Sequence, residues 1–326
     1  MIVVTGGAGF IGSNLLAELE GRGELVVVDR MGSDERWRNV AKRELADVIR
    51  PEEVFDFLHD RGGDIEAVFH MGAISATTER DVDLIVEQNI RLTLDLFRWC
   101  AQEKVRLIYA SSAATYGDGS GGFEDDDSID ALAQLRPMNA YGWSKHVVDR
   151  RIARVLREGG SHPPQVVGLK FFNVYGPNEY HKGSMRSVVH QVHPLAAAGE
   201  SARLFESHHP DYEHGGQLRD FVYVKDVCAV MAWLYDHPEV QGLYNLGTGQ
   251  ARSFADLARA VYQALGKDPL IEYVPMPEEL RGRYQYFTEA RMEKLVAAGW
   301  TQGFTSLEDG VRDYVQAYLE QEDPYR

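Results

Sequence analysis

Two side chains in the segment YGWSK at residues 141–145 have the types and spacing of an acid–base pair. Tyr141 and Lys145 stand four residues apart, which places them on one face of a helix. A free tyrosine ionises near pH 10, and a nearby lysine cation favours the phenolate, so we expect Lys145 to lower the pKa of Tyr141. Tyr141 could then remove a proton from an alcohol. Because this spacing is also common on solvated helices, the neighbouring elements must support the interpretation.

The amino-terminal segment has the pattern of a dinucleotide-binding unit. Residues 2–5 (IVVT) predict a buried strand, a glycine-rich turn follows at 6–12 (GGAGFIG), and residues 13–20 predict a helix. Glycines at such a turn let the backbone approach a pyrophosphate closely, and the helix N-terminus offers free N–H groups to phosphates. An ordinary glycine turn is the alternative, but the position between strand and helix favours a cofactor site.

The residues after the next expected strand, 25–28, bear on which dinucleotide binds. Asp29 stands about 20 residues beyond the glycines, where an acidic side chain usually bonds the ribose hydroxyls of NAD. Arg30 and Arg36 follow, and arginine near this place accommodates the additional phosphate of NADP. The chemistry of these residues leaves NAD and NADP open.

Strand and helix patterns alternate as far as residue 171. Further strands are expected at 67–70, 107–110 and 166–171, and helices at 84–102 and from Tyr141 onward. This alternation predicts an α/β fold with a doubly wound parallel (Rossmann) sheet, in which ligands collect at the carboxyl ends of the strands. The residues expected at those ends are Gly6, Asp29, Gly72, Ser111 and Asn173.

Beyond this point the pattern is less regular. We expect residues 1–174 to form the dinucleotide-binding domain and residues 175–326 a smaller carboxy-terminal substrate-binding domain, interleaved with the first. The segment 118–130, rich in Gly, Asp and Ser, predicts a solvated loop. Residues 207–217 carry three histidines, but without strict ligand spacing they favour a loop over a metal site. The helices expected in this half lie near 185–198, 225–236, 253–265 and 305–320.

Composition argues against several classes of function. The chain has 326 residues and a formal net charge of −16, which argues against a nucleic-acid partner because phosphate backbones attract cationic surfaces. No apolar run reaches about 18 residues, and no signal peptide precedes the first strand, so we expect a cytoplasmic protein without a membrane partner. The two cysteines, Cys100 and Cys228, fall in apolar stretches and are expected to be buried thiols, without a disulfide or zinc site.

Three motifs identify a family. With TGGAGFIG at 5–12, ASSAATYG at 110–117 and YGWSK at 141–145, the chain resembles the extended short-chain dehydrogenase/reductase family over nearly its whole length. The resemblance implies an enzyme in which Ser112 holds the substrate oxygen from which Tyr141 removes a proton. Four later segments resemble the branch of that family whose substrate is ADP-heptose: FNVYGPNEYHKGSM at 172–185, RDFVYVKDV at 219–227, YNLGTG at 244–249 and LRGRYQYFT at 280–288.

The resemblance to this branch implies an isomerase. Its members oxidise the sixth carbon of the heptose transiently and return the hydride to the opposite face, which inverts the configuration. The lysine of HKGS, here Lys182, would be a second base facing Tyr141 across the sugar. A homo-oligomer, as large as a pentamer, and a preference for NADP with NAD as the alternative are also implied.

Together with the motifs, the resemblance assigns residues to each role. The catalytic residues are Tyr141, Lys182, Ser112 and Lys145. The cofactor-binding residues are Gly6, Gly9, Phe10, Ile11, Gly12, Asp29, Arg30, Arg36, Met71, Gly72, Ala73, Ile74, Ser75, Asn89, Lys145, Val174 and Lys182. The substrate-binding residues are Ser112, Asn173, Ser184, Gln191, Phe205, Glu206, Arg219 and Tyr284, with Arg281 and Arg283 as further cations for the diphosphate.

Other functions share parts of this pattern. A UDP-hexose 4-epimerase, or another nucleotide-sugar epimerase, would carry the same glycines, Tyr141 and Lys145, and turnover of UDP-hexose would reveal it. A 4,6-dehydratase needs an acid pair directly after the catalytic hydroxyl residue, where this chain has Ala113 and Ala114. A protein of another class, a catalytically silent dinucleotide-sensing regulator, would show no turnover at all.

Overall fold

A central seven-stranded sheet organises the chain, which a computed structural model describes at residues 1–281 and 284–326. The strand order is β10-β6-β5-β4-β1-β2-β3, and every neighbouring pair is parallel. The strands are β1 (Ile2–Thr5), β2 (Leu25–Val28), β3 (Asp47–Ile49), β4 (Ala67–His70), β5 (Arg106–Ser112), β6 (Val166–Phe171) and β10 (Gly242–Leu246). The expected doubly wound α/β fold is confirmed.

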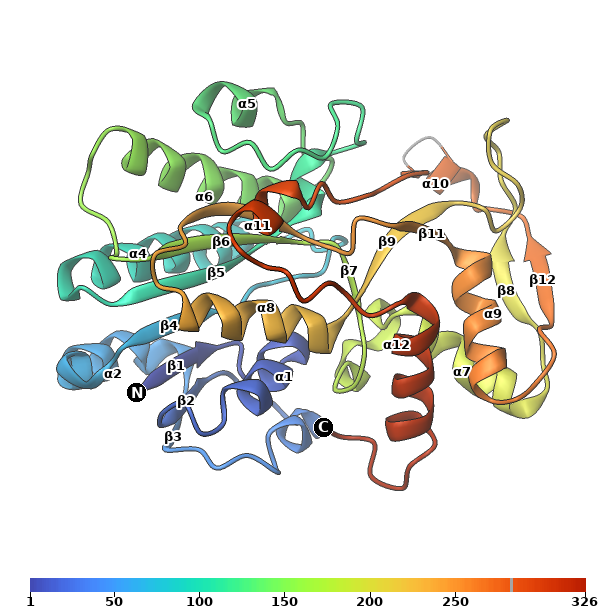
Figure 1. The fold of residues 1–326 in the computed structure, drawn as a ribbon, viewed down its shortest axis with the longest axis horizontal. Coiled ribbons are helices and arrows are strands. Elements are labelled where there is room, and N and C mark those ends of the chain that lie inside the picture. Colours follow the sequence, from blue (N-terminus) through green and yellow to red (C-terminus); the bar gives the residue numbers. More distant parts are fainter. Residues whose placement is uncertain (282–283) are drawn as a thin grey trace.

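Helices cover both faces of this sheet (Figure 1). Strands β1, β2 and β4 are nearly continuous runs of β-branched and apolar residues because both of their faces are buried. Within β1, Ile2 and Val4 belong to one hydrophobic cluster and Val3 to the other. The first cluster includes α1 (Phe10–Leu19) and α8 (Val224–Asp236), and the second includes α2 (Val54–Arg61), α4 (Leu92–Glu103) and α6 (Ala140–Arg157).

The second half of the chain contributes to this sheet and also forms a separate lobe, on the right in Figure 1. Strand β10 belongs to the central sheet, and helix α8 packs in the same hydrophobic cluster as α1. The division into two interleaved domains with a boundary at residue 174 stays a prediction. The lobe contains α7 (Val188–Ala198), α9 (Phe254–Ala264), α12 (Leu307–Tyr314), a parallel pair of β8 (Ala202–Phe205) and β12 (Ile271–Val274), and a small sheet of β7 (Asn173–Tyr175), β9 (Leu218–Tyr223) and β11 (Ala251–Ser253).

Short elements connect these layers. The helix expected at 84–102 begins as α3 (Val82–Ile85), passes through a π-helical turn η4 (Val86–Arg91), and continues as α4. π-Helical turns occur often at functional sites, and Asn89 lies in this one. The remaining short elements are η1 (Glu35–Asn39), η2 (Pro51–Glu53), η3 (Gly62–Asp64), η5 (Ala113–Tyr116), α5 (Ile129–Gln134), η6 (Tyr180–Met185), α10 (Glu278–Arg281), α11 (Glu293–Ala297) and η7 (Val315–Leu319).

The segment 118–130 differs from its prediction. It is not a solvated loop throughout, because Phe123 and Asp125 are buried and the Asp125 carboxylate accepts a hydrogen bond from the Asn245 backbone N–H at 2.8 Å. This bond ties the segment to β10, a long-range contact that local composition does not predict. Cys100 and Cys228 are buried, as expected. None of the helices in the described part of the chain is long and apolar enough to cross a bilayer.

Candidate functional site

The predicted site residues gather at the carboxyl edge of the parallel sheet. Gly6 follows β1, Asp29 follows β2, Met71 follows β4, Ser112 ends β5 and Asn173 follows β6. This is the edge at which doubly wound sheets bind ligands.

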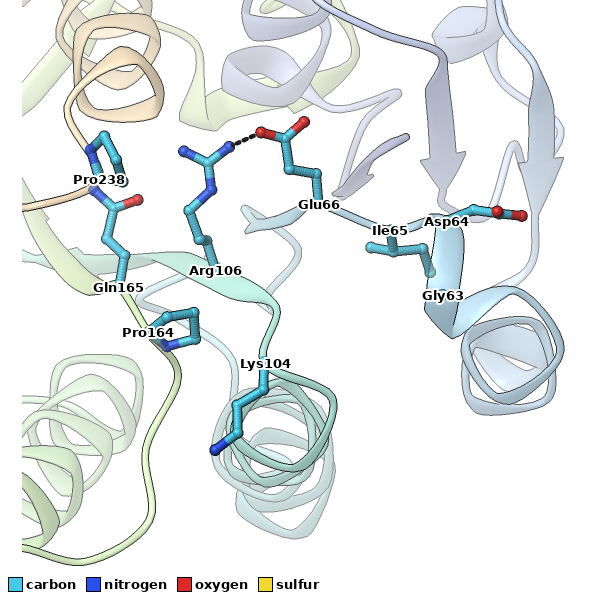
Figure 2. A pocket seen from close by; sticks show the side chains of 9 residues that line it. All are labelled: Gly63, Asp64, Ile65, Glu66, Lys104, Arg106, Pro164, Gln165 and Pro238. Atoms are coloured by element: carbon cyan, nitrogen blue, oxygen red, sulfur yellow. Dashed lines mark hydrogen bonds and ion pairs between the residues drawn. The ribbon is translucent and has the colours of Figure 1, made fainter.

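The amino edge of the sheet has a cavity of its own (Figure 2). It has a volume of about 450 Å³ and lies where β4 and β5 begin, next to an ion pair between Glu66 and Arg106. None of the predicted site residues lines it. We therefore place the functional site at the carboxyl edge.

The turn after β1 is built so closely that only glycine fits. Gly6 has φ +65°, and a Cβ atom there would lie 2.6 Å from the Cα atom of Gly72, which follows β4. A Cβ atom on Gly12 would lie 2.2 Å from the carbonyl oxygen of Gly6. Helix α1 then begins after Gly9, which provides no side-chain cap, so its first N–H groups remain available to an anion.

We expect Gly6→Ala to destabilise the protein through this close approach. The additional Cβ atom must displace the backbone of Gly72, at a cost of about 1–3 kcal/mol beyond the strain of positive φ. Gly21→Ala is the matched control, because Gly21 has φ +81° and nothing within 4 Å of the added atom. Urea unfolding measures both variants, and equal losses of stability would contradict the predicted contact.

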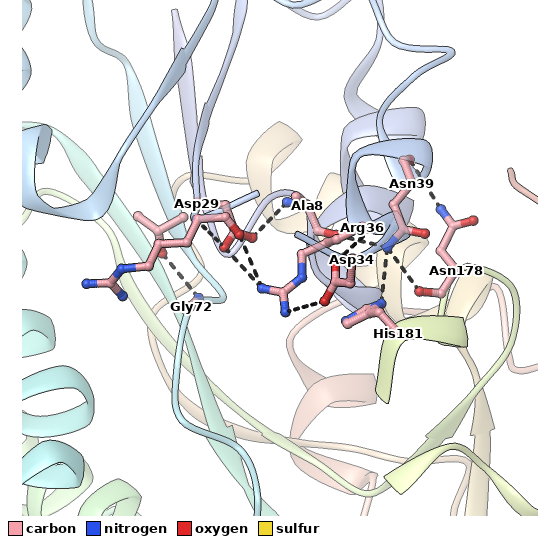
Figure 3. A network of polar contacts seen from close by, with 10 residues as sticks. Ala8, Asp29, Asp34, Arg36, Asn39, Gly72, Asn178 and His181 are labelled. Carbon is pink, nitrogen blue, oxygen red and sulfur yellow. Dashed lines mark hydrogen bonds and ion pairs between the residues drawn. The ribbon is translucent and has the colours of Figure 1, made fainter. Parts of the chain in front are cut away.

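Asp29 is held beneath this turn (Figure 3). Its carboxylate accepts hydrogen bonds from the backbone N–H groups of Ala8, at 3.0 Å, and Arg30, at 2.7 Å. Burial raises the pKa of Asp29, and these donors and the Arg36 guanidinium oppose the rise. The carboxylate is therefore fixed at the place where the sequence predicts the adenosine ribose.

The two predicted arginines, Arg30 and Arg36, have different ion-pair partners. Arg36 lies 3.7 Å from Asp29 and 3.4 Å from Asp34, and its buried Nε atom has no hydrogen-bond partner among the described residues. The side chain of Arg30 is exposed and pairs with Glu52. Arg36 is thus brought to the Asp29 carboxylate, and Arg30 is held by another partner.

Asn39 and Asn178 are structural supports of the glycine turn that the sequence reasoning missed. The Asn39 amide donates to the carbonyl oxygens of Ala8, at 2.9 Å, and Asn178, at 3.2 Å (Figure 3). Asn178 itself adopts φ +70°, which is unusual for a residue other than glycine. The Pro177-Asn178 dipeptide, a turn signal, was the available sequence clue.

Tyr141, Lys145 and Ser112 lie together on the other side of the site. Asn139 caps the N-terminus of α6 through a 2.8 Å bond to the N–H of Gly142, which places Tyr141 in the first turn. The buried Lys145 ammonium lies 6.0 Å from the centroid of the Tyr141 ring. Ser112 is buried at the end of β5, and its side chain lowers the pKa of Tyr141. The three predicted residues therefore lie together.

Burial changes the expected electrostatics of this trio. It raises the pKa of Tyr141, an effect that Ser112 opposes and the Asp149 charge strengthens. It also lowers the pKa of Lys145 to about 8, which Asp149 opposes. The direction predicted for the pKa of Tyr141 is therefore wrong, because the effect of burial dominates.

Asn89 connects the trio to the loop after β4. Its side chain bonds both backbone groups of Ile74, the N–H at 2.8 Å and the carbonyl at 3.0 Å. It also donates to the Ser144 hydroxyl at 3.0 Å, and Ser144 donates to the carbonyl of Tyr141 at 2.7 Å. The predicted cofactor residues of this loop and the catalytic helix are thereby held in one arrangement.

His70 is a third buried polar residue that the sequence reasoning missed. Its ring lies within hydrogen-bonding distance of the hydroxyls of Thr5, at 2.6 Å, and Thr93, at 2.8 Å. Burial, with a contribution from the Lys145 charge, lowers the pKa of His70 to about 3, so the ring is neutral. Its two contacts connect β4 to β1 and to α4.

Lys182 is placed against the glycine turn. It belongs to η6, and its ammonium lies 4.9 Å from the centroid of the Phe10 ring. Burial lowers its pKa, and the nearby Glu179 opposes this. The buried Glu179 also accepts hydrogen bonds from the backbone and hydroxyl of Ser187, which fixes both ends of the HKGSM segment. A position of Lys182 opposite Tyr141 stays a prediction.

Arg219 forms a cationic centre in the second lobe. It is 8% exposed and lies 5.6 Å from the ring centroid of Phe254 and 5.4 Å from that of Tyr284. The Phe205 ring packs edge-on against Tyr284 at 6.3 Å. Among the side chains that the structure describes, which do not include Glu279, no carboxylate pairs with Arg219, and a buried cation of this kind is suited to an anionic ligand.

Several predicted residues are not brought into these groups. Gln191 is exposed and donates to the carbonyl of Arg186 at 2.7 Å. Arg281 is also exposed, and Arg283 lies outside the described residues. Ser75 and Ser184 are exposed, and Ile11, Ala73, Val174 and Glu206 are half-buried. Of the residues already placed at the site, Asn173 is exposed and Met71 and Ile74 are half-buried.

The loop 207–217 is an aromatic cluster. The rings of His209, Tyr212 and Tyr286 lie 5.2–5.3 Å apart, and the N–H of Ser207 donates to His214 at 3.0 Å. Where residues are described, no group of three or more His, Cys, Asp or Glu side chains could hold a metal ion. Packing among rings accounts for the composition of the loop.

Similarity to known proteins defines the class to which the chain belongs. Residues 2–247 match the NAD dependent epimerase/dehydratase family. Since the match spans well over half of the sequence, the chain belongs to the NAD dependent epimerase/dehydratase family. The family resemblance drawn from the motifs is confirmed.

Particular relatives are similar over their entire length. ADP-L-glycero-D-manno-heptose-6-epimerase of Nitratidesulfovibrio vulgaris strain DP4 is 50% identical, with 100% of both chains covered. The crystal structure of Helicobacter pylori ADP-L-glycero-D-manno-heptose-6-epimerase superposes with a TM-score of 0.77 at 29% identity, covering 97% of this chain and 95% of that one. Thermus thermophilus UDP-glucose 4-epimerase, in complex with NAD, gives a TM-score of 0.73 at 28% identity, covering 96% and 97%.

Proposed function

We propose that the chain interconverts the D-glycero and L-glycero forms of ADP-manno-heptose by epimerisation at the sixth carbon. The observation that carries this proposal is the 50% identity, over the full length of both chains, to an ADP-L-glycero-D-manno-heptose-6-epimerase. The site geometry supports the reaction type, because a dinucleotide cradle lies beside a serine, a tyrosine and a lysine at one edge of the sheet. A UDP-hexose 4-epimerase is the second candidate, favoured by the fold shared with the Thermus thermophilus enzyme.

The chemistry of the substrate explains why a redox cofactor is needed. The sixth carbon of the heptose is a secondary alcohol carbon without an adjacent carbonyl, so its C–H bond is too weakly acidic for direct deprotonation. A bound nicotinamide dinucleotide would accept a hydride from this carbon and later return it. The cradle fits such a group, because the first N–H groups of α1 are free for a phosphate and Asp29 and Arg36 lie at the expected ribose position.

The residues of the chain would handle the protons. Tyr141 would take the hydroxyl proton as the hydride leaves, and Ser112 would hold the same oxygen. Lys145 would stabilise the phenolate and orient the nicotinamide ribose. The ketone formed is planar, so a return of hydride to its opposite face inverts the centre. Lys182, by family resemblance, would serve as the second base for the other orientation of the hydroxyl.

The second lobe would bind the ADP part of the substrate. Arg219 is a buried cation framed by Phe254 and Tyr284, and a diphosphate would supply the missing counter-charge. The positive charge of Arg219 is local to this site, which explains how a chain with a net charge of −16 would bind an anion.

For the cofactor we propose NADP, with NAD as the alternative. Arg36 supports NADP, because its unpartnered Nε atom lies near the ribose position, and Asp29 supports NAD. The substrate-binding role of residues 175–326, a homo-oligomeric state as large as a pentamer, and a location in the cytoplasm are further proposals that rest on sequence and family resemblance.

A direct test begins with the purified protein. Mass spectrometry of the nucleotide that copurifies is expected to find NADP, and incubation with the D-glycero form of ADP-heptose is expected to give the L-glycero form. In deuterium oxide the product should carry no deuterium at the sixth carbon, because the hydride stays within the site. Turnover of UDP-glucose but not ADP-heptose would favour the second candidate, and solvent deuterium in the product would rule out the hydride mechanism.

A further inference from the structure

A buried charged cluster lies beneath the catalytic helix, and the proposed chemistry does not use it. Asp149 lies on α6, four residues beyond Lys145 and eight beyond Tyr141, so all three share one face of the helix. Asp149 is only 1% exposed. A carboxylate at this depth requires partners that compensate for its loss of water.

The partners come from the two central strands. One oxygen of Asp149 accepts a hydrogen bond from the Tyr109 hydroxyl at 3.1 Å, and the other accepts one from Ser111 at 2.7 Å. The second oxygen also lies 3.1 Å from the ammonium of Lys170, which is fully buried in β6. The pair is therefore neutral overall, and it joins α6 to both β5 and β6.

The same cluster reaches the turn that presents Ser112. The Lys170 ammonium donates to the Thr115 hydroxyl at 2.5 Å, and Thr115 donates to the carbonyl of Ser112 at 2.9 Å. The Tyr116 ring also packs against the Lys170 ammonium, with 4.6 Å between its centroid and the nitrogen. One network of polar contacts thus holds the supports of all three members of the Ser112, Tyr141 and Lys145 trio.

A gain in stability is a weak explanation for the presence of a buried ion pair such as Asp149 and Lys170. Removing two charges from water costs about as much as their attraction returns, and well-packed apolar residues of similar volume often replace a buried pair without loss. The position of the pair suggests a more specific use. The charge of Asp149 also opposes the effect of burial on Lys145, raising the pKa of that lysine and so favouring its cation.

We propose that Asp149 and Lys170 are positioning residues for the catalytic trio. Their ion pair fixes the face of α6 that carries Tyr141 and Lys145, and the turn that carries Ser112, to the edge formed by β5 and β6. Neither side chain needs to touch a ligand, because both act through the residues that do. The inference rests on the proposed function and adds two residues to it.

The double variant Asp149→Leu/Lys170→Met tests this role. It removes both charges at nearly constant volume, so its melting temperature is expected to stay within about 5 °C of the parent. We expect kcat for ADP-heptose to fall about tenfold while KM stays within about twofold, because small displacements of catalytic groups slow the chemical step. A double variant that is folded and has the parent's kcat would overturn the proposal.

The control breaks an ion pair at the opposite edge of the sheet. Glu66→Gln removes the partner of Arg106 (Figure 2), and we expect a lower melting temperature with unchanged kcat. If the double variant does not fold, Thr115→Val and Ser111→Ala each remove one tie of the network. Each is expected to lower kcat about threefold at unchanged KM, and an unchanged kcat in both would equally overturn the proposal.

A second readout separates this inference from the proposed substrate. Affinity for NADP needs no sugar, and we expect it to weaken about fivefold in the double variant because Lys145 is displaced. A parent enzyme that fails to convert ADP-heptose would refute the proposed function alone. Unchanged affinity for NADP together with unchanged turnover of whichever nucleotide sugar the parent accepts would refute the positioning role.

Discussion

Replacement of Tyr141 by phenylalanine is expected to lower kcat for epimerisation by about 10³-fold, within the range known for the loss of a general base. The phenol is the group that Ser112 and Lys145 surround at the end of β5, and phenylalanine keeps the ring while removing the proton acceptor. Because the cofactor cradle at Gly6 is separate, the variant should retain its dinucleotide. Steady-state turnover and the absorbance of the purified variant measure the two effects.

A matched control removes a different tyrosine hydroxyl. Tyr244 lies on β10, and Tyr244→Phe loses a hydroxyl that donates to the carbonyl of Gln241. Its kcat is expected to remain within about twofold of the parent. A Tyr141→Phe enzyme as active as this control would show that another group accepts the proton.

Replacement of Lys182 by methionine is expected to have the second largest effect, a loss of about 10²-fold in turnover. Methionine keeps the length of the side chain and removes the charge and the proton-transfer site. Hydride transfer from each epimer to the cofactor is a half-reaction, and it is more informative than the overall rate. The equilibrium constant between the two epimers forces the forward and reverse turnover to slow together. In single turnovers, hydride transfer from one epimer should be slow and transfer from the other nearly normal.

The absorbance of reduced nicotinamide after mixing with each epimer separately measures these half-reactions. Lys104→Met is the control, since Lys104 lines the cavity at the opposite edge of the sheet (Figure 2). Turnover of Lys182→Met within about twofold of the parent would refute the two-base scheme. Equal slowing of both half-reactions would instead assign Lys182 to cofactor binding, consistent with its contact with Phe10.

The amino-acid sequence was sufficient for the core of the fold. The run IVVT predicts a strand because β-branched residues suit a sheet that is buried on both faces, and β1 spans those residues. The glycine turn, the ends of the strands β1, β2, β4 and β6, and the helix that carries Tyr141 and Lys145 follow from local patterns of this kind, whereas β5 extends two residues beyond its expected end. Strand β3 was missed because it is short and only Ile49 in it is buried.

Polar details of the site depended on contacts between distant residues. From the sequence, Arg30 and Arg36 are equally good candidates for contact with the cofactor. In the structure Arg30 forms an ion pair with Glu52, whereas Arg36 lies next to Asp29. The expected fall in the pKa of Tyr141 failed for the same reason, since burial depends on everything packed around a side chain. Three histidines in 207–217 gave no indication of the cluster with Tyr286.

The sequence by itself determined the class of fold and which residues meet at the carboxyl edge of the sheet, whereas the binding of ligands there and the reacting side chains stay predictions. These properties arise from short-range rules: the conformational freedom of glycine, the two-sided burial of strands, and the spacing of residues on a helix. Only the tertiary structure decided which charges are paired, which are desolvated, and which residues lie behind the trio. Asp149 and Lys170 are 21 positions apart in the chain, and folding of α6 onto β6 brings their charged groups to 3.1 Å.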